Sequence, residues 1–231
     1  MKLLYATNNN SKIYNMKRRL SNLPVEIVSP KDLNIKLNVA ENGNTAIENA
    51  IKKASAYYEA IGIPTIAGDS GLYIENIPEE KQPGLFVRRV NGKELTDDEM
   101  IDYYTKLVDS IGGKTIAYYI TGLAIVTEDG IKTIEIEEDK FILTSKISKI
   151  NHRGNPLDVM SIDPKINKYY TEMSAKDFKN SGQKFDVECL QFINENILKK
   201  ETQLNEVKWA NGFVNDSFLP YEFEGQIRRL K

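Results

Sequence analysis

Apolar runs and longer, helix-like stretches alternate along the first part of this chain. Residues 2–6, 25–29 and 63–67 are short apolar runs bounded by turn-forming residues, a pattern typical of buried strands. Residues 12–20 and 45–61 have the length of helices, and the second of them repeats its apolar positions at helical spacing. Strands that alternate with helices predict an α/β fold.

The next part of the chain adds two helices and a hairpin. Residues 96–111 predict a helix that Thr96 caps, with acidic side chains in its first turn. Residues 115–127 and 131–144 predict an antiparallel hairpin, and residues 184–198 predict the last helix. The antiparallel hairpin follows parallel α/β units, so we expect a mixed β-sheet with flanking helices.

One domain accounts for most of the chain. No internal repeat or low-complexity tract interrupts residues 1–198, and the mildest boundary lies near Lys199. Residues 199–231 form an extension rich in aromatic side chains, which we expect to pack on the body or on a dimer partner.

Composition excludes several classes of protein. The 231 residues carry a net charge of −2, which disfavours a nucleic-acid binder but leaves a small anionic ligand possible. The single cysteine, Cys189, allows no internal disulfide, is expected in the core, and favours the cytoplasm. We expect no signal peptide and no membrane span, because no window approaches the ~18 apolar residues that a span needs.

The first loop has the character of a phosphate site. A strand ends at Ala6, and a polar loop leads into a helix that begins near Lys12. Such a loop directs backbone N–H groups and a helix dipole at one point, and Lys12 adds a cation. The loop has no glycine and is not a Walker loop. The plainer alternative is an asparagine-rich turn that only caps the helix.

Carboxylates and cations recur in three further segments. Glu41 precedes a glycine-containing turn, and Asp69 lies in Gly68–Gly71, which we predict to be a turn after a buried strand. Arg89 is one of a pair of arginines that follow another turn. The alternatives are an ordinary turn aspartate and solvated arginines. Together, Glu41 and Asp69 could hold a divalent cation, and Lys12, Lys53 and Arg89 could contact phosphates, as hydrolysis of a phosphoanhydride requires.

Four segments between residues 7 and 89 have a fixed order and spacing. They are Thr7-Asn8-Asn9-x-x-Lys12, Glu41-x-Gly43-x-Thr45-x-x-Glu48-Asn49-Ala50-x-x-Lys53-Ala54, Asp69-Ser70-Gly71-Leu72 and Pro83-Gly84-x-x-x-x-Arg89. Together they resemble the Ham1, or inosine triphosphate pyrophosphatase, family. The segment Lys168-Tyr169-Tyr170-Thr171-Glu172-Met173-Ser174 is similar to a further family segment, more faintly.

The resemblance implies a long mixed sheet in two lobes around a nucleotide cleft, and a homodimer. It implies Mg²⁺-dependent cleavage of a nucleoside triphosphate between its α- and β-phosphates. Glu41 and Asp69 would bind Mg²⁺, Asp69 would activate water, and Lys12 would act on the phosphates. The expected substrate-binding residues are Thr7, Asn8, Asn9, Asn10, Ser11, Lys12, Lys53, Ser70, Arg89, Asp158, Lys168, Gln183 and Lys184.

The chain departs from the family pattern at three places. Gly68 replaces an aspartate, for which Glu48 or Glu75 are the candidate substitutes. Asn155 replaces an aromatic residue that would stack on the base, although Asp158 remains, and Trp209 or Phe213 of the extension are candidate replacements.

The third departure concerns the residues that read the base. Gln183 and Lys184 stand where the family has a His-Arg pair, so we expect weaker discrimination against standard purines. Two other functions remain open: a nucleotide-binding or sensing protein without catalysis, and, less favoured by the charge, a nucleic-acid-associated protein.

Overall fold

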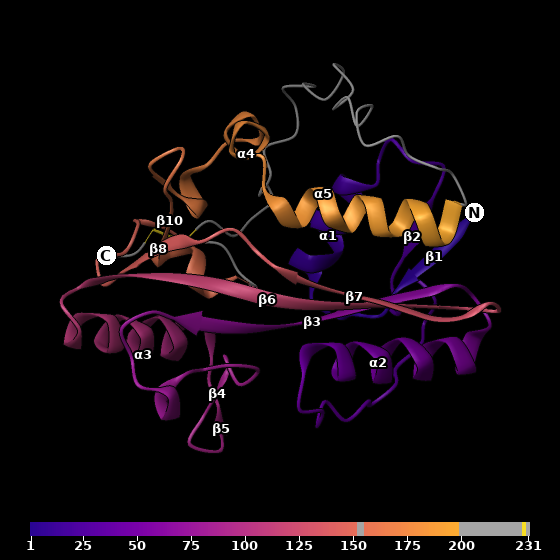
Figure 1. Cartoon of the computed structure of the whole chain (residues 1–231), viewed down its shortest axis with the longest axis horizontal. Helices are drawn as coiled ribbons and strands as arrows, with labels where there is room; N and C mark the ends of the chain where they lie inside the picture. Colours follow the sequence, from indigo (N-terminus) through magenta and orange to yellow (C-terminus); the bar gives the residue numbers. More distant parts are fainter. Residues whose placement is uncertain (152–154, 199–227, 230–231) are drawn as a thin grey trace.

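One mixed β-sheet organises the molecule in the computed structural model, which describes residues 1–151, 155–198 and 228–229 (Figure 1). Eight strands form this sheet within the described ranges, in the order β11-β10-β8-β6-β3-β1-β2, with β7 also paired to β6. Its strands are β1 (Lys2–Tyr5), β2 (Glu26–Val28), β3 (Thr65–Ile74), β6 (Lys114–Thr127), β7 (Gly130–Glu137), β8 (Phe141–Thr144), β10 (Ser161–Asp163) and β11 (Lys168–Tyr169). Two small ribbons pair β4 (Arg89–Val90) with β5 (Lys93–Glu94), and β9 (Ile150–Asn151) with β12 (Arg228–Arg229).

Most of the helices begin where the sequence provides a side-chain cap. The five α-helices are α1 (Asn10–Arg19), α2 (Ala46–Ile61), α3 (Asp97–Ser110), α4 (Ala175–Ser181) and α5 (Lys184–Ile193), among the residues described. Asn9 caps α1, Thr45 caps α2, and Thr96 caps α3 in a reciprocal capping box with Glu99. The helices predicted near 12–20, 45–61 and 96–111 are therefore confirmed to within two residues. No helix of the described part is long and apolar enough to span a membrane.

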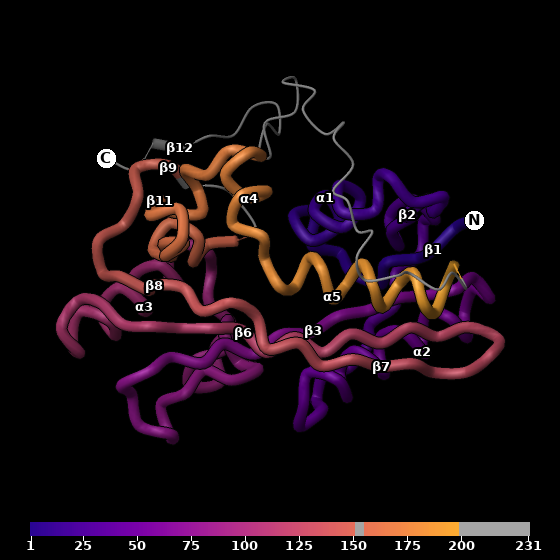
Figure 2. The backbone as a smooth tube through the Cα atoms, turned by 45° about the horizontal axis from the view of Figure 1, so that its top comes forward, coloured from indigo at the N-terminus to yellow at the C-terminus, as the bar shows by residue number. Residues whose placement is uncertain are grey.

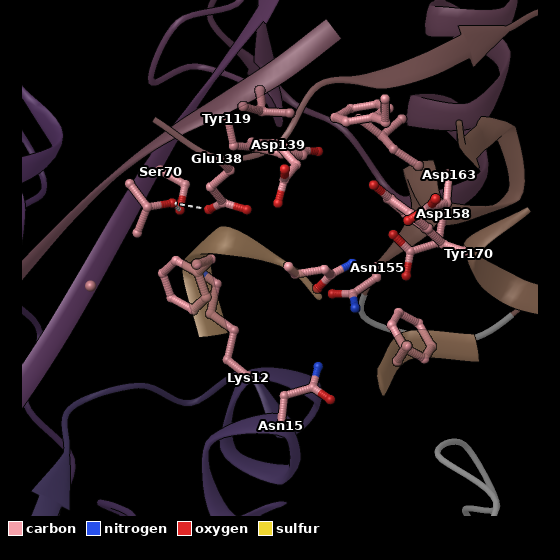
Figure 3. A pocket seen from close by; sticks show the side chains of 18 of the residues that line it. Lys12, Asn15, Ser70, Tyr119, Glu138, Asp139, Asn155, Asp158, Asp163 and Tyr170 are labelled. Carbon is pink, nitrogen blue, oxygen red and sulfur yellow. Dashed lines mark hydrogen bonds between the residues drawn. The ribbon is translucent and has the colours of Figure 1, made fainter. Parts of the chain in front are cut away.

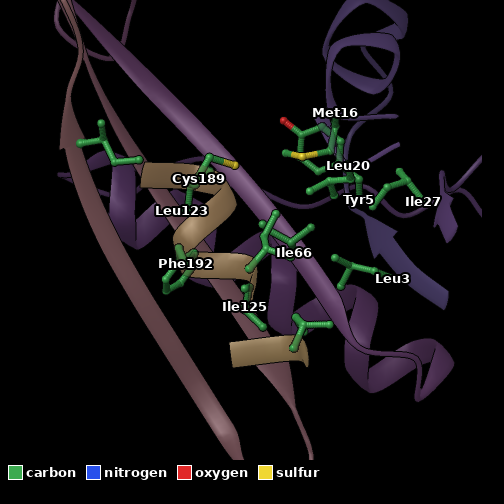
Figure 4. Packing of buried hydrophobic residues seen from close by; sticks show 13 residues of the cluster. Leu3, Tyr5, Met16, Leu20, Ile27, Ile66, Leu123, Ile125, Cys189 and Phe192 are labelled. Carbon is green, nitrogen blue, oxygen red and sulfur yellow. The ribbon is translucent and has the colours of Figure 1, made fainter. Parts of the chain in front are cut away.

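The two long strands β3 and β6 carry helices on both faces (Figures 1 and 2). On one face, Ala50, Ala54 and Tyr57 of α2 are buried against Ala67 and Ala124. On the opposite face lie α1 and α5, with Met16 and Cys189 in one core. The prediction that Cys189 is a core residue is confirmed, since its side chain is fully buried (Figure 4).

That second face of the β3–β6 pair is apolar at both ends and polar in the middle. At one end Ile66 and Leu123 pack under α1 and α5, and at the other Leu72 packs with Tyr104 of α3. Between these two cores the face presents Ser70 and Thr121, which are directly opposite each other across the strands. The sheet therefore links two separately packed lobes, as expected from the resemblance.

The prediction of a turn at Gly68–Gly71 is wrong. These residues are in the middle of β3, which pairs with β6 without interruption from Thr65 opposite Val126 to Ile74 opposite Ala117. Glycine, aspartate and serine favour turns locally, but ten consecutive cross-strand pairs outweigh that preference. On its other edge β3 pairs with β1 only at Thr65 and Ile66 and next bridges to Gly84 at Leu72, so no strand among the described residues pairs with this edge from Ala67 to Gly71, where it is open.

The predicted second arm of the hairpin, 131–144, is divided into two strands. Ile120 of β6 pairs with Glu137, whereas Ala117 pairs with Phe141. Two residues of β6 therefore face three residues, Glu138 to Lys140, which is the signature of a β-bulge. The side chain of Glu138 faces the polar middle of the sheet by ordinary strand alternation, since Ile136, two residues before it, pairs with Thr121 and is buried on the same face.

Candidate active site

A cavity of about 420 Å³ lies at the polar break between the two cores (Figure 3). Its walls come from α1, from β3 and β6, from the bulge between β7 and β8, and from the segments around Asn155 and Gln183. Of the residues expected to bind substrate, Asn9, Lys12, Ser70, Asp158 and Gln183 line it. This volume is in the range of small-molecule sites.

Lys12 points into the cavity from the first turn of α1 (Figure 3). The side chain of Asn9 accepts hydrogen bonds from the backbone N–H groups of Ser11 and Lys12, at 2.9 and 3.1 Å, which fixes the turn. Burial, together with the charge of Lys53, lowers the pKa of the Lys12 ammonium. No carboxylate among the described residues forms an ion pair with Lys12, so its charge remains available to an anion.

The rest of the first loop faces elsewhere. Thr7 accepts a hydrogen bond from the backbone N–H of Asn9 at 3.2 Å, and Ser11 is buried. Asn8 and Asn10 are exposed, outside the cavity lining. The capping role that the alternative interpretation gave to this loop is therefore present, and it coexists with the placement of Lys12.

Glu41, Lys53 and Asp69 meet beside the open edge of β3. The Lys53 Nζ lies 3.3 Å from Glu41 Oε2, 3.9 Å from Asp69 Oδ1 and 3.1 Å from the carbonyl oxygen of Gly68. Asn49 donates to Asp69 Oδ2 at 2.8 Å and accepts from the backbone N–H of Gly43 at 2.7 Å. Three residues that the sequence separates by up to 28 positions thus form one cluster.

This cluster and the cavity lie on opposite faces of β3, because side chains alternate along a strand. Gly68 and Ser70 face the cavity, while Asp69 faces α2. The charges of the cluster still reach the cavity side, since Lys53, Asp69 and Glu41 all act on the pKa of Lys12.

The carboxylates of Glu41 and Asp69 already lie beside one positive charge, the Lys53 ammonium. Two convergent carboxylates of this kind fit a hard cation. No group of three acidic, histidine or cysteine side chains in the described part of the chain comes together as a metal site. Oxygens of a bound phosphate would have to complete the coordination, which is the usual arrangement for Mg²⁺. The two candidate substitutes for the missing aspartate are engaged elsewhere: Glu48 accepts a hydrogen bond from the backbone N–H of Asn44 at 2.7 Å, and Glu75 pairs with Lys140 at 2.6 Å.

Glu138 is a cavity carboxylate that the sequence patterns did not indicate. Ser70 Oγ lies 2.6 Å from Thr121 Oγ1, which donates to Glu138 Oε1 at 2.5 Å (Figure 3). Burial raises the pKa of the Glu138 carboxyl, against the effects of Thr121, Arg19 and Lys12. Strand alternation places Glu138 on the same face as Ile136, but the sequence alone does not show that this face forms a cavity beside Thr121.

Aromatic side chains form part of the cavity wall. Besides Tyr5, they are Tyr119, Phe141, Tyr170, Phe178 and Phe185. Asn155 and Asp158 lie beside them, and burial raises the pKa of Asp158 to about 7. An aromatic wall is therefore present although Asn155 replaces the expected ring, whereas Trp209 and Phe213 lie outside the described residues.

Three of the expected cations lie away from the cavity. Arg89 is exposed, with its guanidinium 5.0 Å from the ring centroid of Phe86, while its neighbour Arg88 lines the cavity. Lys168 pairs with Asp177 at 3.0 Å. Lys184 donates to the carbonyl oxygen of Glu137 at 2.9 Å, outside the cavity.

Known proteins resemble the chain over most of its length. The sequence model of the Ham1 family matches residues 3–181. A dITP/XTP pyrophosphatase of Leptospira interrogans is 31% identical over 180 residues, covering 78% of this chain and 88% of the relative. A dITP/XTP pyrophosphatase of Thermoanaerobacter pseudethanolicus is 30% identical over 201 residues, covering 87% and 98%.

Solved structures share the fold. The Staphylococcus aureus Ham1 protein superposes with a TM-score of 0.61 at 23% identity, covering 84% of this chain and 98% of that one. A HAM1 protein from Coxiella burnetii gives a TM-score of 0.64 at 22% identity, with the same coverage. The two-lobed sheet is therefore common to these proteins.

Proposed function

The chain belongs to the Ham1 family, and on that premise we propose that it hydrolyses non-standard purine nucleoside triphosphates to nucleoside monophosphate and pyrophosphate. Two of its relatives are named dITP/XTP pyrophosphatase. One observation carries the proposal: Lys12, a cavity cation that forms no ion pair with any described residue, lies within electrostatic reach of the carboxylates Glu41 and Asp69.

The triphosphate belongs at the start of α1. The positive end of the helix dipole and the Lys12 ammonium favour a polyanion there. Lys53 approaches the same strand edge from α2, held by Glu41 and Asp69. These contacts carry no information about the base, so they suit any nucleoside triphosphate.

Asp69 is the proposed general base, and Glu41 and Asp69 the proposed ligands of Mg²⁺. The ion, when bound, would offset the charge of the phosphates and polarise them. Asp69 accepts a proton from a water molecule whose oxygen attacks the α-phosphorus; the bond from that phosphorus to the bridging oxygen breaks, and pyrophosphate leaves. Asn49, which donates to Asp69 Oδ2, keeps the carboxylate in one orientation.

The test is release of pyrophosphate, measured with Mg²⁺ over ITP, XTP, dITP, 8-oxo-dGTP and the standard nucleotides. We expect pyrophosphate and the matching monophosphate in equal amounts from at least one non-standard purine. Release of inorganic phosphate with a diphosphate product, or no turnover of any nucleotide, would contradict the proposal.

A second candidate function is nucleotide binding without turnover. Gly68 brings no carboxylate to the cavity, and Glu48 and Glu75 have other partners, which favours a weakened acidic cluster. Calorimetric titration with ITP distinguishes the two functions, since a sensor binds the nucleotide and leaves it intact.

The proposed assembly is a homodimer, which the family resemblance supports. Sedimentation equilibrium measures it directly: we expect twice the monomer mass of 26.3 kDa.

A further inference from the structure

The cavity-facing side of α1 carries polar groups along its whole length. Lys12, Asn15 and Arg19 all line the cavity, at the spacing of three and four residues that defines one helix face. At a rise of ~1.5 Å per residue, Arg19 lies about 10 Å further along the helix than Lys12. A nucleotide whose phosphates are bound at Lys12 therefore extends toward Arg19.

The guanidinium of Arg19 is fixed by two neighbours from α5. Its Nε forms an ion pair with Asp186 Oδ1, and its plane lies over Phe185 with 4.7 Å to the ring centroid. The Arg19 and Asp186 side chains are only 14% and 12% exposed. The described residues provide no hydrogen-bond partner for the two terminal nitrogens, so these donors remain available to a ligand.

Arg19 differs from Lys12 in how its positive charge is compensated. Asp186 compensates the Arg19 charge at close range, whereas Lys12 has no such partner among the residues described. A compensated guanidinium offers directional N–H donors without a strong net charge. Such a group suits a neutral, hydrogen-bonding part of a ligand better than a phosphate.

Glu138 supplies the complementary acceptor. Its carboxylate lies in the cavity, where Oε1 accepts from Thr121 and no described residue is hydrogen-bonded to Oε2. Arg19 and Glu138 both line the cavity, and the charges of Arg19 and Lys12 both act on the Glu138 carboxyl, so this acceptor lies within reach of both cations.

Building on the proposed triphosphate hydrolysis, we propose that Arg19 and Glu138 read the base and select a 6-oxopurine. O6 and N7 accept from the terminal nitrogens of Arg19, and N1–H donates to the carboxylate of Glu138. Adenine reverses this pattern, since its amino group would face the guanidinium and its unprotonated N1 the carboxylate. Unpaired groups of this kind can reject a wrong base by ~10⁴-fold, so strong discrimination replaces the weak discrimination expected from Gln183 and Lys184.

The test is the ratio of kcat/KM for ITP over ATP in Arg19→Gln, Arg19→Lys and Glu138→Gln. A bidentate base contact contributes ~1–3 kcal/mol, so we expect each variant to lower the ratio by about 10- to 100-fold. Arg19→Lys fails like Arg19→Gln because a lysine cannot form the fork. Lys17→Met is the matched control: it removes an exposed cation of the same helix, paired with Asp32, and should leave the ratio unchanged.

Inhibition by inorganic tripolyphosphate separates base reading from phosphate binding. We expect its inhibition constant to be unchanged in all variants, since it has no base. Weaker inhibition in Arg19→Gln, with equal losses for ITP and ATP, would assign Arg19 to the phosphates and overturn the proposal. If the Arg19 variants do not fold, Glu138→Gln decides alone, and an unchanged ratio in that variant overturns it.

Binding of IMP and AMP to the wild type keeps the base-reading proposal separate from the proposed function. If no nucleotide is turned over, the proposed hydrolysis fails. A preference for IMP that disappears in Arg19→Gln would then still support base reading, and equal affinities in the wild type would overturn it.

Discussion

At the scale of single residues, Asp69 has a position that its sequence motif alone does not explain. One of its oxygens is held by Asn49, and the other lies 3.9 Å from the Lys53 ammonium. This arrangement keeps the carboxylate oriented but leaves one oxygen able to exchange its partner for a metal or a water molecule. The proposed general base is therefore fixed from the α2 side and free toward the phosphates.

Replacing Asp69 with Asn should abolish pyrophosphate release while the protein remains folded. The amide binds Mg²⁺ poorly and cannot take a proton from water, and loss of a general base alone costs ~100-fold or more. Steady-state turnover and a circular dichroism melt measure the two effects. Asp102→Asn, in an exposed pair with Lys106, is the control, and turnover of Asp69→Asn within about threefold of the parent would contradict the assignment.

Lys12→Ala should weaken the binding of every nucleoside triphosphate to a similar extent, whatever its base. A cation on the phosphates carries no base information, and its charge lies about 10 Å along α1 from Arg19. The KM values for ITP, XTP and ATP measure this. If the change in KM differed by an order of magnitude between the bases, Lys12 would contact the base and not the phosphates.

Asp158 should make the folded state lose stability as the pH rises from about 4 to 7. Burial raises its pKa from 3.8 to about 7, so in this range the folded state keeps a proton that the unfolded state has lost. The effect on the free energy of unfolding is on the order of a few kcal/mol. Asp158→Asn removes it, so urea titrations should find the variant more stable than the parent at pH 8 and similar at pH 4; equal stability at pH 8 would show that Asp158 ionises normally.

Only some residues of the candidate site could be predicted from the sequence. Lys12 and Asp69 belong to segments with recognisable spacing, and both have the surroundings that the proposed roles require. Arg19 and Glu138 escaped prediction because their roles depend on distant partners. Asp186 is 167 positions from Arg19, and Glu138 is hydrogen-bonded to Thr121 of another strand, 17 positions away.

At the scale of secondary structure, local capping residues determine where the helices begin, whereas pairing with distant strands determines which segments are strands. Capping residues such as Asn9 and Thr96 mark helix starts that the sequence predicts well. The segment Gly68–Gly71 has turn-forming composition, yet its pairing with β6 makes it a strand. Its small residues leave room for the cavity, and this function explains a composition that is poor for a strand.

Gly122 sets how closely α2 approaches the sheet. A Cβ at this position would lie 2.4 Å from the backbone nitrogen of Ile47 and 2.6 Å from the carbonyl carbon of Ala46. Gly122→Ala should therefore push α2 away, destabilise the fold by ~1–3 kcal/mol, and lower turnover because Asn49 and Lys53 move with the helix. Thermal melts and turnover measure both effects. Thr133→Ala, at an exposed position of β7, is the control, and a parental melting temperature in Gly122→Ala would mean that α2 adjusts without strain.

At the scale of the whole molecule, the cavity exists because the core is divided. Ile66 and Leu72 belong to different apolar clusters of one continuous strand, and the residues between them are too small or too polar to join the two. The two lobes are therefore connected mainly through β3 and β6. A ligand that contacts α1 on one side and the bulge on the other adds a second connection.

Nucleotide binding should therefore raise the melting temperature of the entire protein in one transition. Binding to the folded state alone adds ~2.7 kcal/mol to the free energy of unfolding at a ligand concentration of ~100 Kd. Calorimetric scans with and without IMP measure the shift. A transition that splits, with one half unaffected by IMP, would show that the ligand contacts a single lobe.

Because Cys189 is buried, the reactivity of its thiol measures how often the protein opens locally. It is the only thiol in the chain, and burial raises its pKa to about 12, so a thiol reagent can reach it only when α5 separates from the sheet. The same helix carries Asp186, the anchor of Arg19. The rate of alkylation at Cys189 therefore measures how often Asp186 moves away from Arg19, the proposed base-reading residue. This measurement does not require catalysis.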